Sequence, residues 1–264
     1  MPRLRPSDAA RRAREAAPEF SEALARGLAV ITAFDASRPR LSLSEVAAKI
    51  DLPRATARRA LLTLVHLGYA ESDGKRFALA PQVLRLASAY LAAGGAAVLQ
   101  RACERLSRAL GEACSAAARD GADVVMIAHA APPRFLGAGA GVGFRLPAFA
   151  TALGRVLLAG LDDAALDAFL ATLTPVAMTA RTVTDRAALR RLIRKTRTQG
   201  WAFADQEAEA GFRSIAVPVR RYDGAVAAAL NVGVRVEAAT PEQMRKVFLP
   251  RLLETAKELD GQLV

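Results

Sequence analysis

The segment PRATARRALLTLVHLG, residues 53–68, restricts the fold of this chain more than any other stretch. It predicts one helix with a single apolar face, on which four residues recur at helical spacing: Ala57, Leu61, Leu64 and Gly68. The arginines of the segment fall in the first two turns and off that face. We therefore expect the C-terminal half of the helix to pack on a core, while the N-terminal half stays free to contact a polyanion.

Two more helices are expected just before this one. Ser42 is followed three positions later by Glu45, the capping-box pattern that begins a short helix. Pro53 suits the first turn of the arginine-bearing helix because its missing N–H would have had no partner there. An earlier amphipathic helix is indicated by apolar residues at helical spacing: Leu24, Leu28 and Ile31.

A short basic hairpin is predicted directly after the three helices. In YAESDGKRFAL, residues 69–79, an Asp73-Gly74 turn separates two short extended runs. Three helices and a basic hairpin in this order predict a winged helix-turn-helix, although a basic helix face is more often only solvated. The candidate DNA-binding residues are Arg54, Thr56, Arg58, Arg59, Thr63, Lys75 and Arg76.

The charge of the chain agrees with a polyanionic partner. Its 264 residues carry a formal net charge of +11, enough length for two domains and enough charge to attract nucleic acid or an anionic surface. Residues 1–85 hold 15 Lys or Arg against 9 Asp or Glu, and the remainder holds 22 against 17. Because we see neither an apolar run of about 18 residues nor a secretory signal, we expect a cytoplasmic protein without a membrane partner.

The second part of the chain predicts an α+β domain. A helical stretch after Pro81 is interrupted at Gly94-Gly95, which favours a hinge between domains. Its apolar residues pack either on a second subunit or within the chain: Val83, Ala87, Tyr90 and Leu91. Extended runs then surround turns at Asp120-Gly121 and Asp223-Gly224. Helices are expected at 162–171, at 185–199 and after Thr240-Pro241, the last with a kink at Pro250.

Catalytic and metal chemistry find little support. The only cysteines and histidines are Cys103, Cys114, His66 and His129, which suit neither a disulfide framework nor usual zinc spacing. Two catalytic pairs can be drawn, namely Cys114 with His129, or Ser214 with Asp205 or Glu207. Because no nucleophile-elbow motif accompanies either pair, we expect neither an enzyme, nor a metal, nor a cofactor.

Three segments together resemble one family of regulators. They are LARGLAVITAFD, LSLSEVAAKIDLPRATARRALLTLVHLGYAE and GFRSIAVPVRRYDGAVAAALNVG, and the likeness runs from about residue 20 to the C-terminus. The chain is similar to the IclR family of bacterial transcriptional regulators, especially the branch that controls protocatechuate and 4-hydroxybenzoate catabolism. The resemblance implies a basic tail (1–19), a winged helix-turn-helix domain (20–82), a linker helix (83–97) and a GAF- and PAS-like effector-binding domain (98–264). It also implies a homodimer or a dimer of dimers.

The resemblance further implies a pocket for a small organic acid. Its motifs bring forward Arg134, Phe135, Leu146, Ala152, Leu153, Ser214 and Asn231. Arg134 would hold a carboxylate, unless it is only a surface arginine after Pro132-Pro133, and Phe135 would form an aromatic wall. Two departures are notable. Ala55 replaces the serine that many relatives carry before the equivalent of Thr56, and Asp205 is offset by one from an acidic position near Ala204.

Three functions remain open from the sequence. The first is a ligand-controlled transcription factor bound to a double-stranded operator, the second a nonspecific nucleoid-type DNA binder, and the third an enzyme with an accessory winged helix. A second domain of about 165 residues argues against the nucleoid protein, because architectural DNA binders have no need of a ligand pocket. We therefore predict an effector-responsive regulator of aromatic-acid catabolic genes, whose effector is a small organic acid, either an aromatic acid or a ring-cleavage product. The sequence does not identify the exact effector, the operator or the direction of regulation.

Overall fold

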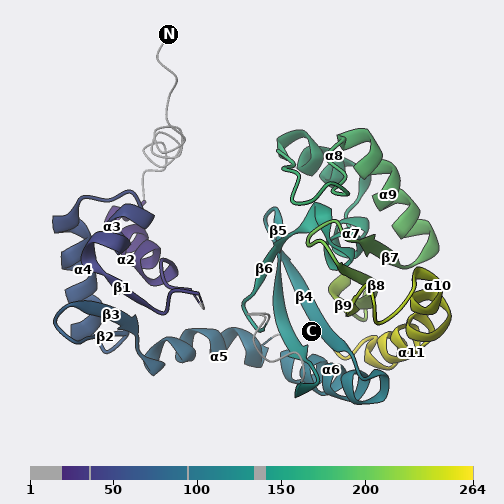
Figure 1. Cartoon of the computed structure of the whole chain (residues 1–264), viewed down its shortest axis with the longest axis horizontal. Coiled ribbons are helices and arrows are strands. Elements are labelled where there is room, and N and C mark those ends of the chain that lie inside the picture. The colour runs from purple at the N-terminus through teal and green to yellow at the C-terminus, as the bar shows by residue number, and fades with distance from the viewer. Residues whose placement is uncertain (1–19, 36, 94, 134–140, 264) are drawn as a thin grey trace, which may run out of the picture. The chain divides into compact units, whose positions relative to one another are not determined.

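A computed structural model describes residues 20–35, 37–93, 95–133 and 141–263 (Figure 1). The chain divides into two compact units, Met1–Ala87 and Ser88–Val264, and each is described by itself. The sequence-based expectation of a helix-turn-helix unit followed by an α+β unit is confirmed.

In the residues described, the first unit has three helices and a small sheet. In chain order its elements are α2 (Glu22–Thr32), β1 (Arg40–Ser42), α3 (Leu43–Lys49), α4 (Arg54–His66), β2 (Ala70–Ser72) and β3 (Arg76–Leu79). The strands form an antiparallel sheet in the order β1-β3-β2. Its core is Val30, Ala33, Leu41, Val46, Leu61, Leu64 and Ala70.

The ends of α3 and α4 follow from local hydrogen bonding. The capping box of α3 is confirmed, because the Glu45 amide donates to Ser42 Oγ at 3.3 Å and the Ser42 amide donates to Glu45 Oε2 at 2.7 Å. Pro53 precedes α4 as its N-cap, one residue earlier than expected. Gly68 is exposed and lies beyond the helix at φ +77°, so placing it on the buried stripe was wrong. It belongs instead to a left-handed helix end, in which Tyr69 N donates to Leu64 O.

Two features of this unit were not expected from the sequence. Strand β1 pairs with β3 and adds a third strand to the hairpin. On α2, the buried residue is Val30, whereas Leu24 and Leu28 are 64% and 50% exposed within this chain. The apolar spacing therefore marked the helix correctly, but the face that it marked is largely exposed.

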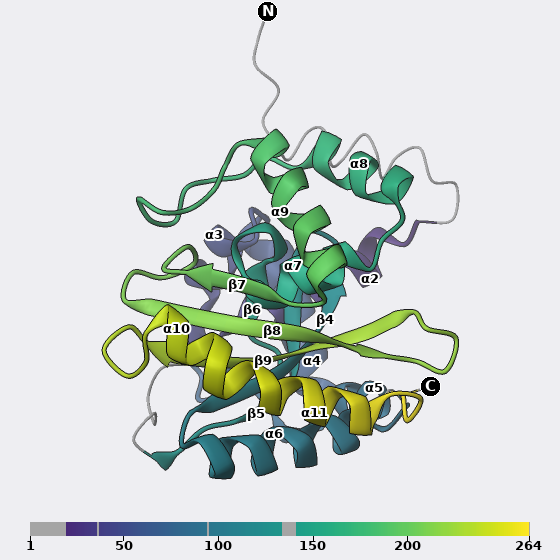
Figure 2. The same cartoon turned by 90° about the vertical axis from the view of Figure 1, so that its right-hand side faces the viewer.

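The second unit is a six-stranded antiparallel sheet with helices on both faces (Figure 2). The strand order is β6-β5-β4-β9-β8-β7. The strands are β4 (Ala113–Asp120), β5 (Asp123–Ala130), β6 (Arg145–Pro147), β7 (Ala202–Asp205), β8 (Phe212–Arg220) and β9 (Val226–Arg235). The helices are α5 (Leu84–Ala93, which spans the division), α6 (Ala96–Leu110), α7 (Ala152–Ala159), α8 (Asp163–Thr172), α9 (Arg186–Gln199), α10 (Pro241–Gln243) and α11 (Leu249–Leu259).

The sheet separates two hydrophobic cores. Helices α6 and α11 pack on one face, where Leu99, Leu230 and Leu252 are fully buried. Helix α7 lies on the other face, with α8 and α9 beyond it (Figure 2), and there Leu153, Leu158 and Ile193 are buried. This second face also leaves room for an internal cavity between the sheet and the start of α7.

Most local predictions for this unit are confirmed. The turns at Asp120-Gly121 and Asp223-Gly224 join β4 to β5 and β8 to β9. Helices α8 and α9 occupy the expected segments, and Thr240 caps α10 through a second capping box. A π-helical turn, Met244–Phe248, leads from α10 into α11, which has Pro250 in its first turn.

Candidate functional site

The first candidate site is the N-terminal half of α4. Arg54, Arg58 and Arg59 are exposed, while Ala57 and Leu61 of the same helix are fully buried. Thr56 is half-buried, and the exposed Thr63 donates its hydroxyl to Arg59 O at 2.9 Å. Within the described residues, no ion pair engages the three arginines. The helix thus presents three cations to solvent, as expected for a surface that binds phosphates or base edges.

The β2–β3 hairpin adds two more exposed cations to the same unit. Asp73 Oδ1 accepts from the backbone amides of Arg76 at 2.7 Å and Lys75 at 2.9 Å, which fixes the turn. These amides, that of Arg76 foremost, hold the pKa of Asp73 below its usual range. The Asp73 carboxylate is therefore committed to the turn, and the side chains of Lys75 and Arg76 remain exposed at the wing.

The second candidate site is a cavity of about 190 Å³ in the second unit. Four residues predicted from the sequence line it, namely Leu146, Leu153, Ser214 and Asn231. Ala152 is buried beside it but is not among the lining residues, and Arg134 and Phe135 lie outside the described residues. The other lining residues are Ala113, Ser115, Met126, His129, Ala131, Phe144, Ala150, Thr151, Ala204, Glu207, Ala208, Glu209, Phe212, Gly233 and Arg235.

The cavity lies at the N-terminus of α7. Thr151 caps this helix by accepting from the Gly154 amide at 3.0 Å. The first amides of a helix, here those of Ala152 and Leu153, have no partner within the helix, and its dipole is positive at this end. Because Thr151 and Leu153 both line the cavity, that positive end faces the cavity and would favour a negatively charged group there.

Polar side chains from neighbouring strands form the floor of the cavity. Ser115 on β4 is paired with His129 on β5 and with Asn231 on β9. The Ser115 amide donates to Asn231 Oδ1 at 3.1 Å, and Ser115 Oγ lies 2.9 Å from His129 Nδ1. Ser214, on β8, is 8% exposed. Ser115 and His129 were missed as cavity residues, because only the pairing of strands far apart in the sequence brings them beside Asn231.

Aromatic side chains form part of the wall and an ion pair lies at the rim. Phe144 and Phe212 both line the cavity, and the Phe212 ring lies so close to Gly233 that a Cβ there would be 2.5 Å from it. Arg235 and Glu209 are joined at 2.8 Å with both side chains more than half exposed. The wall and floor together combine apolar surface with a few polar groups, the composition expected of a small-molecule site.

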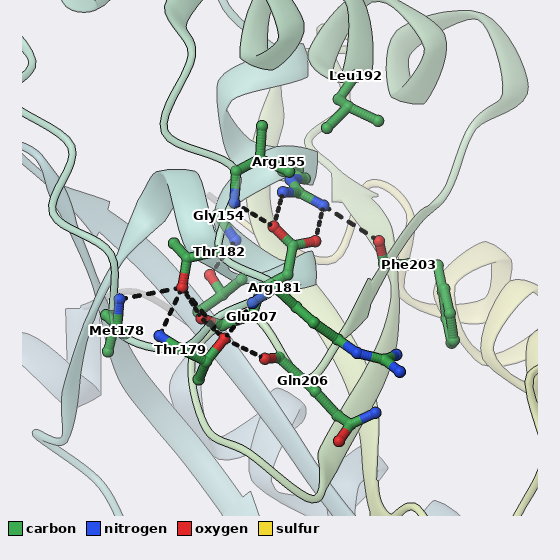
Figure 3. A network of polar contacts seen from close by, with 12 residues as sticks. Gly154, Arg155, Met178, Thr179, Arg181, Thr182, Leu192, Phe203, Gln206 and Glu207 are labelled. Carbon is green, nitrogen blue, oxygen red and sulfur yellow. Dashed lines mark hydrogen bonds and ion pairs between the residues drawn. The ribbon is translucent and has the colours of Figure 1, made fainter.

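Glu207 connects the cavity to a loop that precedes α9 (Figure 3). Its carboxylate accepts from both Nη atoms of Arg155 on α7, one of them at 2.7 Å, and from the Val183 amide at 3.3 Å. Its backbone oxygen accepts from Thr182 Oγ1 at 2.6 Å, and Thr179 Oγ1 donates to Gln206 O at 2.6 Å (Figure 3). The Arg155 and Glu207 side chains are only 3% and 9% exposed.

The structure does not assemble either catalytic pair drawn from the sequence. Cys114 lies in the core under α6, and burial raises the pKa of its thiol, whereas His129 on the neighbouring strand faces the cavity. Asp205 pairs with Arg181 at 2.7 Å and lies 3.0 Å from Arg213 Nε. Glu207 is held by Arg155, so neither carboxylate is available to Ser214 as a base.

A larger and more open groove of about 800 Å³ runs between the β4–β5 turn and α8. Its lining is dominated by apolar residues such as Phe149, Phe169 and Met178, with Arg119 and Asp123 at one side. No buried polar group converges on it in the manner of the cavity floor, among the residues that the structure describes. The smaller cavity is therefore the candidate ligand site.

Metal-binding and membrane-spanning features were sought in the described ranges. No group of three or more His, Cys, Asp or Glu side chains there is arranged to hold a metal ion. No single helix in those ranges is long and apolar enough to cross a membrane, and only the bent pair 81–92 and 96–110 passes that test, by length and composition alone.

Both units match domains of a known protein family. Residues 23–74 match the IclR helix-turn-helix domain, and residues 94–261 match the C-terminal domain of bacterial IclR transcriptional regulators. The chain belongs to the IclR family. Its resemblance to this family, inferred above from three sequence segments, is thereby confirmed.

Individual relatives indicate which branch of the IclR family the chain resembles most. The chain is 42% identical over 248 residues to the Pca regulon regulatory protein of Pseudomonas putida, covering 93% of this chain and 85% of that protein. A transcriptional regulator from Rhodococcus sp. RHA1 is 43% identical, with a TM-score of 0.80 over 92% of this chain and 98% of that one. An IclR homologue of Microbacterium hydrocarbonoxydans, solved with 4-hydroxybenzoate, is 27% identical with a TM-score of 0.75 over 90% and 97%.

Proposed function

We propose that this IclR-family chain is a transcriptional regulator that binds a specific operator and responds to an aromatic acid, controlling genes of aromatic-acid catabolism. The observation that carries the proposal is the cavity at the start of α7, which combines apolar walls with a polar floor in a chain that also holds a helix-turn-helix unit. The names of its Pca relative and its 4-hydroxybenzoate-bound homologue support the ligand class. A DNA partner also favours action in the cytoplasm, which we include in the proposal.

The N-terminal half of α4 is the proposed reader of the operator. Arg54, Arg58 and Arg59 extend from the exposed side of the helix toward the major groove, with Thr56 and Thr63 beside them. Lys75 and Arg76 on the wing contact phosphates, which orient the protein without selecting a sequence.

Operator binding tests this assignment directly. Arg59→Ala is expected to weaken binding to the cognate site by about 1–3 kcal/mol if Arg59 reads a base. Arg251→Ala, which removes an exposed arginine from α11, is the matched control and should leave affinity unchanged. Footprinting and mobility-shift titration measure both. Unchanged affinity for alanine variants of all three α4 arginines would contradict the assignment.

The cavity is the proposed effector site. The carboxylate of the ligand lies at the amides of Ala152 and Leu153, with Ser214 as a further donor, because a helix N-terminus stabilises negative charge. Asn231 contacts the ligand from the floor of the cavity. The ring packs against Phe212 and Leu153. A volume of about 190 Å³ favours a single-ring acid, such as protocatechuate or 4-hydroxybenzoate, or a ring-cleavage product such as β-ketoadipate.

Ligand binding is tested by a thermal-shift screen of aromatic and dicarboxylic acids, followed by titration calorimetry. A ligand that binds only the folded state raises the apparent melting temperature. Ser214→Ala should weaken each binding acid by roughly ten- to a hundredfold, the effect of one hydrogen bond to a charged group. If no carboxylic acid binds the parent protein while a neutral apolar compound does, the proposed ligand class is wrong.

We also propose that the chain acts as a homodimer or a dimer of dimers. One recognition helix contacts too few base pairs to select a promoter, and two related half-sites would lie about 34–36 Å apart, or a multiple of that distance. The exposed apolar residues of α2 and α5, Leu24, Leu28, Leu84, Leu86 and Tyr90, offer surface for a second copy. Light scattering that gives a monomer, together with a footprint on one half-site, would contradict this.

A further inference from the structure

We propose that His129, held by Ser115, recognises a hydroxyl group on the ring of the aromatic acid and so distinguishes hydroxylated acids from unsubstituted ones. The inference rests on the proposed effector site, and it adds a role for the part of that site opposite the carboxylate. One end, at Ser214 and the start of α7, holds the carboxylate, and the other end, at His129, selects the ring substituent.

The position of His129 follows from the pairing of the sheet. Ser214 lies on β8 and His129 on β5, with β9 and β4 between them. Three strand spacings of about 4.8 Å and an offset of two residues along the strands, about 6.6 Å, separate the two backbones by about 16 Å in a flat sheet. Side chains that extend into the cavity from both ends shorten this distance to one that a single-ring acid can span.

A β-bulge adjusts which residues of β5 reach the cavity. The register between β4 and β5 shifts between Ala116 and Ala117, so that Ala116 pairs with Ala128 but Ala117 pairs with Met126. Met126 and His129 therefore both line the cavity although they are three residues apart, whereas Ile127 packs in the core under α6. Met126 supplies apolar surface beside the imidazole, where a flat ring can pack.

The orientation of Asn231 is determined by its partner. Because an amide N–H can only donate, the Ser115 amide at 3.1 Å requires that the atom facing it is Asn231 Oδ1. The Nδ2 group of Asn231 is thereby left as a donor in the floor of the cavity, beside Ser115 and His129. The floor accordingly offers a neutral, directional set of hydrogen-bonding groups rather than a second charge.

The imidazole of His129 is suited to a hydroxyl rather than to a carboxylate. Burial lowers its pKa below the usual value, so the ring is neutral near pH 7. Nδ1 is occupied by Ser115 Oγ at 2.9 Å, which leaves Nε2 for a ligand. A phenolic hydroxyl both donates and accepts, so it can pair with Nε2 in either tautomer of the ring.

Gln100 fixes the strand at this point. Edge strand β6 pairs with β5 only from Asp123 to Val125, and so does not extend as far as His129. The Gln100 side chain on α6 pairs with β5 at this point, because its Oε1 accepts from the His129 amide and its Nε2 donates to the His129 carbonyl, both at 3.0 Å. Gln100 is thus a positioning residue for His129.

The test is titration calorimetry of the full chain with benzoate, 4-hydroxybenzoate and 3,4-dihydroxybenzoate. The parent should bind the two hydroxylated acids more tightly than benzoate. His129→Phe should weaken the hydroxylated acids by about three- to tenfold, the effect of one neutral hydrogen bond, and change benzoate by less than about twofold. His129→Gln keeps a hydrogen-bonding group and should retain part of the preference.

Ser214→Ala is the control at the carboxylate end and should weaken all three acids to a similar extent. Thermal melts and circular dichroism verify that each variant is folded. Two results would overturn the inference: equal affinity of the parent for benzoate and the hydroxylated acids, or an unchanged preference among the three acids in His129→Phe, whether or not their affinities fall together. If the parent binds none of these acids or any other carboxylic acid, the proposed effector class fails as well.

Discussion

Replacing Glu207 by Gln should destabilise the second unit severely, since it removes one charge from a buried ion pair. The Arg155 and Glu207 side chains are 3% and 9% exposed, and the carboxylate accepts from both Nη atoms of the guanidinium. Glu207→Gln keeps the size and the backbone contacts of the residue but leaves the Arg155 charge without its counter-ion.

The expected loss is about 3–5 kcal/mol, the usual cost of breaking a buried pair from one side. An exposed pair provides the comparison. Arg251 and Glu254 lie 3.2 Å apart with side chains 64% and 62% exposed, so Glu254→Gln should cost no more than about 0.5 kcal/mol. Both changes replace a glutamate carboxylate by an amide, and the two sites differ in burial and in the number of bonds that the carboxylate accepts.

The assay is urea unfolding followed by tryptophan fluorescence. Trp201 is the only tryptophan of the chain, and it packs against the core under α6 and α11, so its emission reports the second unit alone. A double-mutant cycle with Arg155→Met completes the measurement. We expect the double variant to lose much less than the sum of the two single losses, because neither charge then remains alone.

A loss below about 1 kcal/mol for Glu207→Gln would refute the reasoning, since it would mean that water or another group compensates the Arg155 charge. Additive single losses would equally refute it. In that case the two residues would stabilise the unit through separate contacts, for example Arg155 through its bond to the Phe203 carbonyl.

Three further predictions concern packing, thiol chemistry and DNA contacts. Gly154→Ala should destabilise the second unit by about 1–3 kcal/mol, because a Cβ there would lie 2.0 Å from a backbone oxygen. The control is Gly27→Ala on α2, where a Cβ would meet no atom within 4 Å, so it should be neutral or stabilising. Calorimetry measures both. Burial raises the pKa of the Cys103 thiol to about 12 and raises that of Cys114 as well. A thiol-specific reagent should therefore label neither cysteine in the native protein and both in urea. Stoichiometric labelling of the native protein would contradict this. Lys75→Ala should reduce the salt dependence of operator binding by about one unit in log–log slope without altering the preferred sequence, and a changed preference in a binding-site selection would contradict a phosphate role.

Local physics explains which parts of the fold were predictable. The Ser42–Glu45 capping box and the Asp73-Gly74 turn depend on residues no more than three positions apart, so the sequence displays every group involved. The separation of apolar and cationic residues along α4 is equally visible, because a helix converts spacing directly into a face. The helix-turn-helix unit, and the α+β character of the second unit, could be inferred on this basis.

Partners distant in sequence explain what was missed. Strand β1 has three residues, too few to show an alternating pattern, and exists because Leu41 pairs with Phe77. The exposure of Leu24 and Leu28 on α2 could not be predicted either. Helical spacing identifies an apolar face, but it does not show whether another part of the chain covers that face.

Some residues of the candidate cavity were predicted from the sequence, and others were not. Ser214 and Asn231 were identified through segments that resemble a known family, but Ser115, His129 and Glu207 were not placed in the cavity by any local pattern. Ser115 meets Asn231 across 116 positions of the chain, and Arg155 meets Glu207 across 52. The sequence determined the helices, turns and basic surface through interactions between near neighbours. Only the tertiary structure decided the polar floor and the buried ion pair, because strand order and register bring those side chains together.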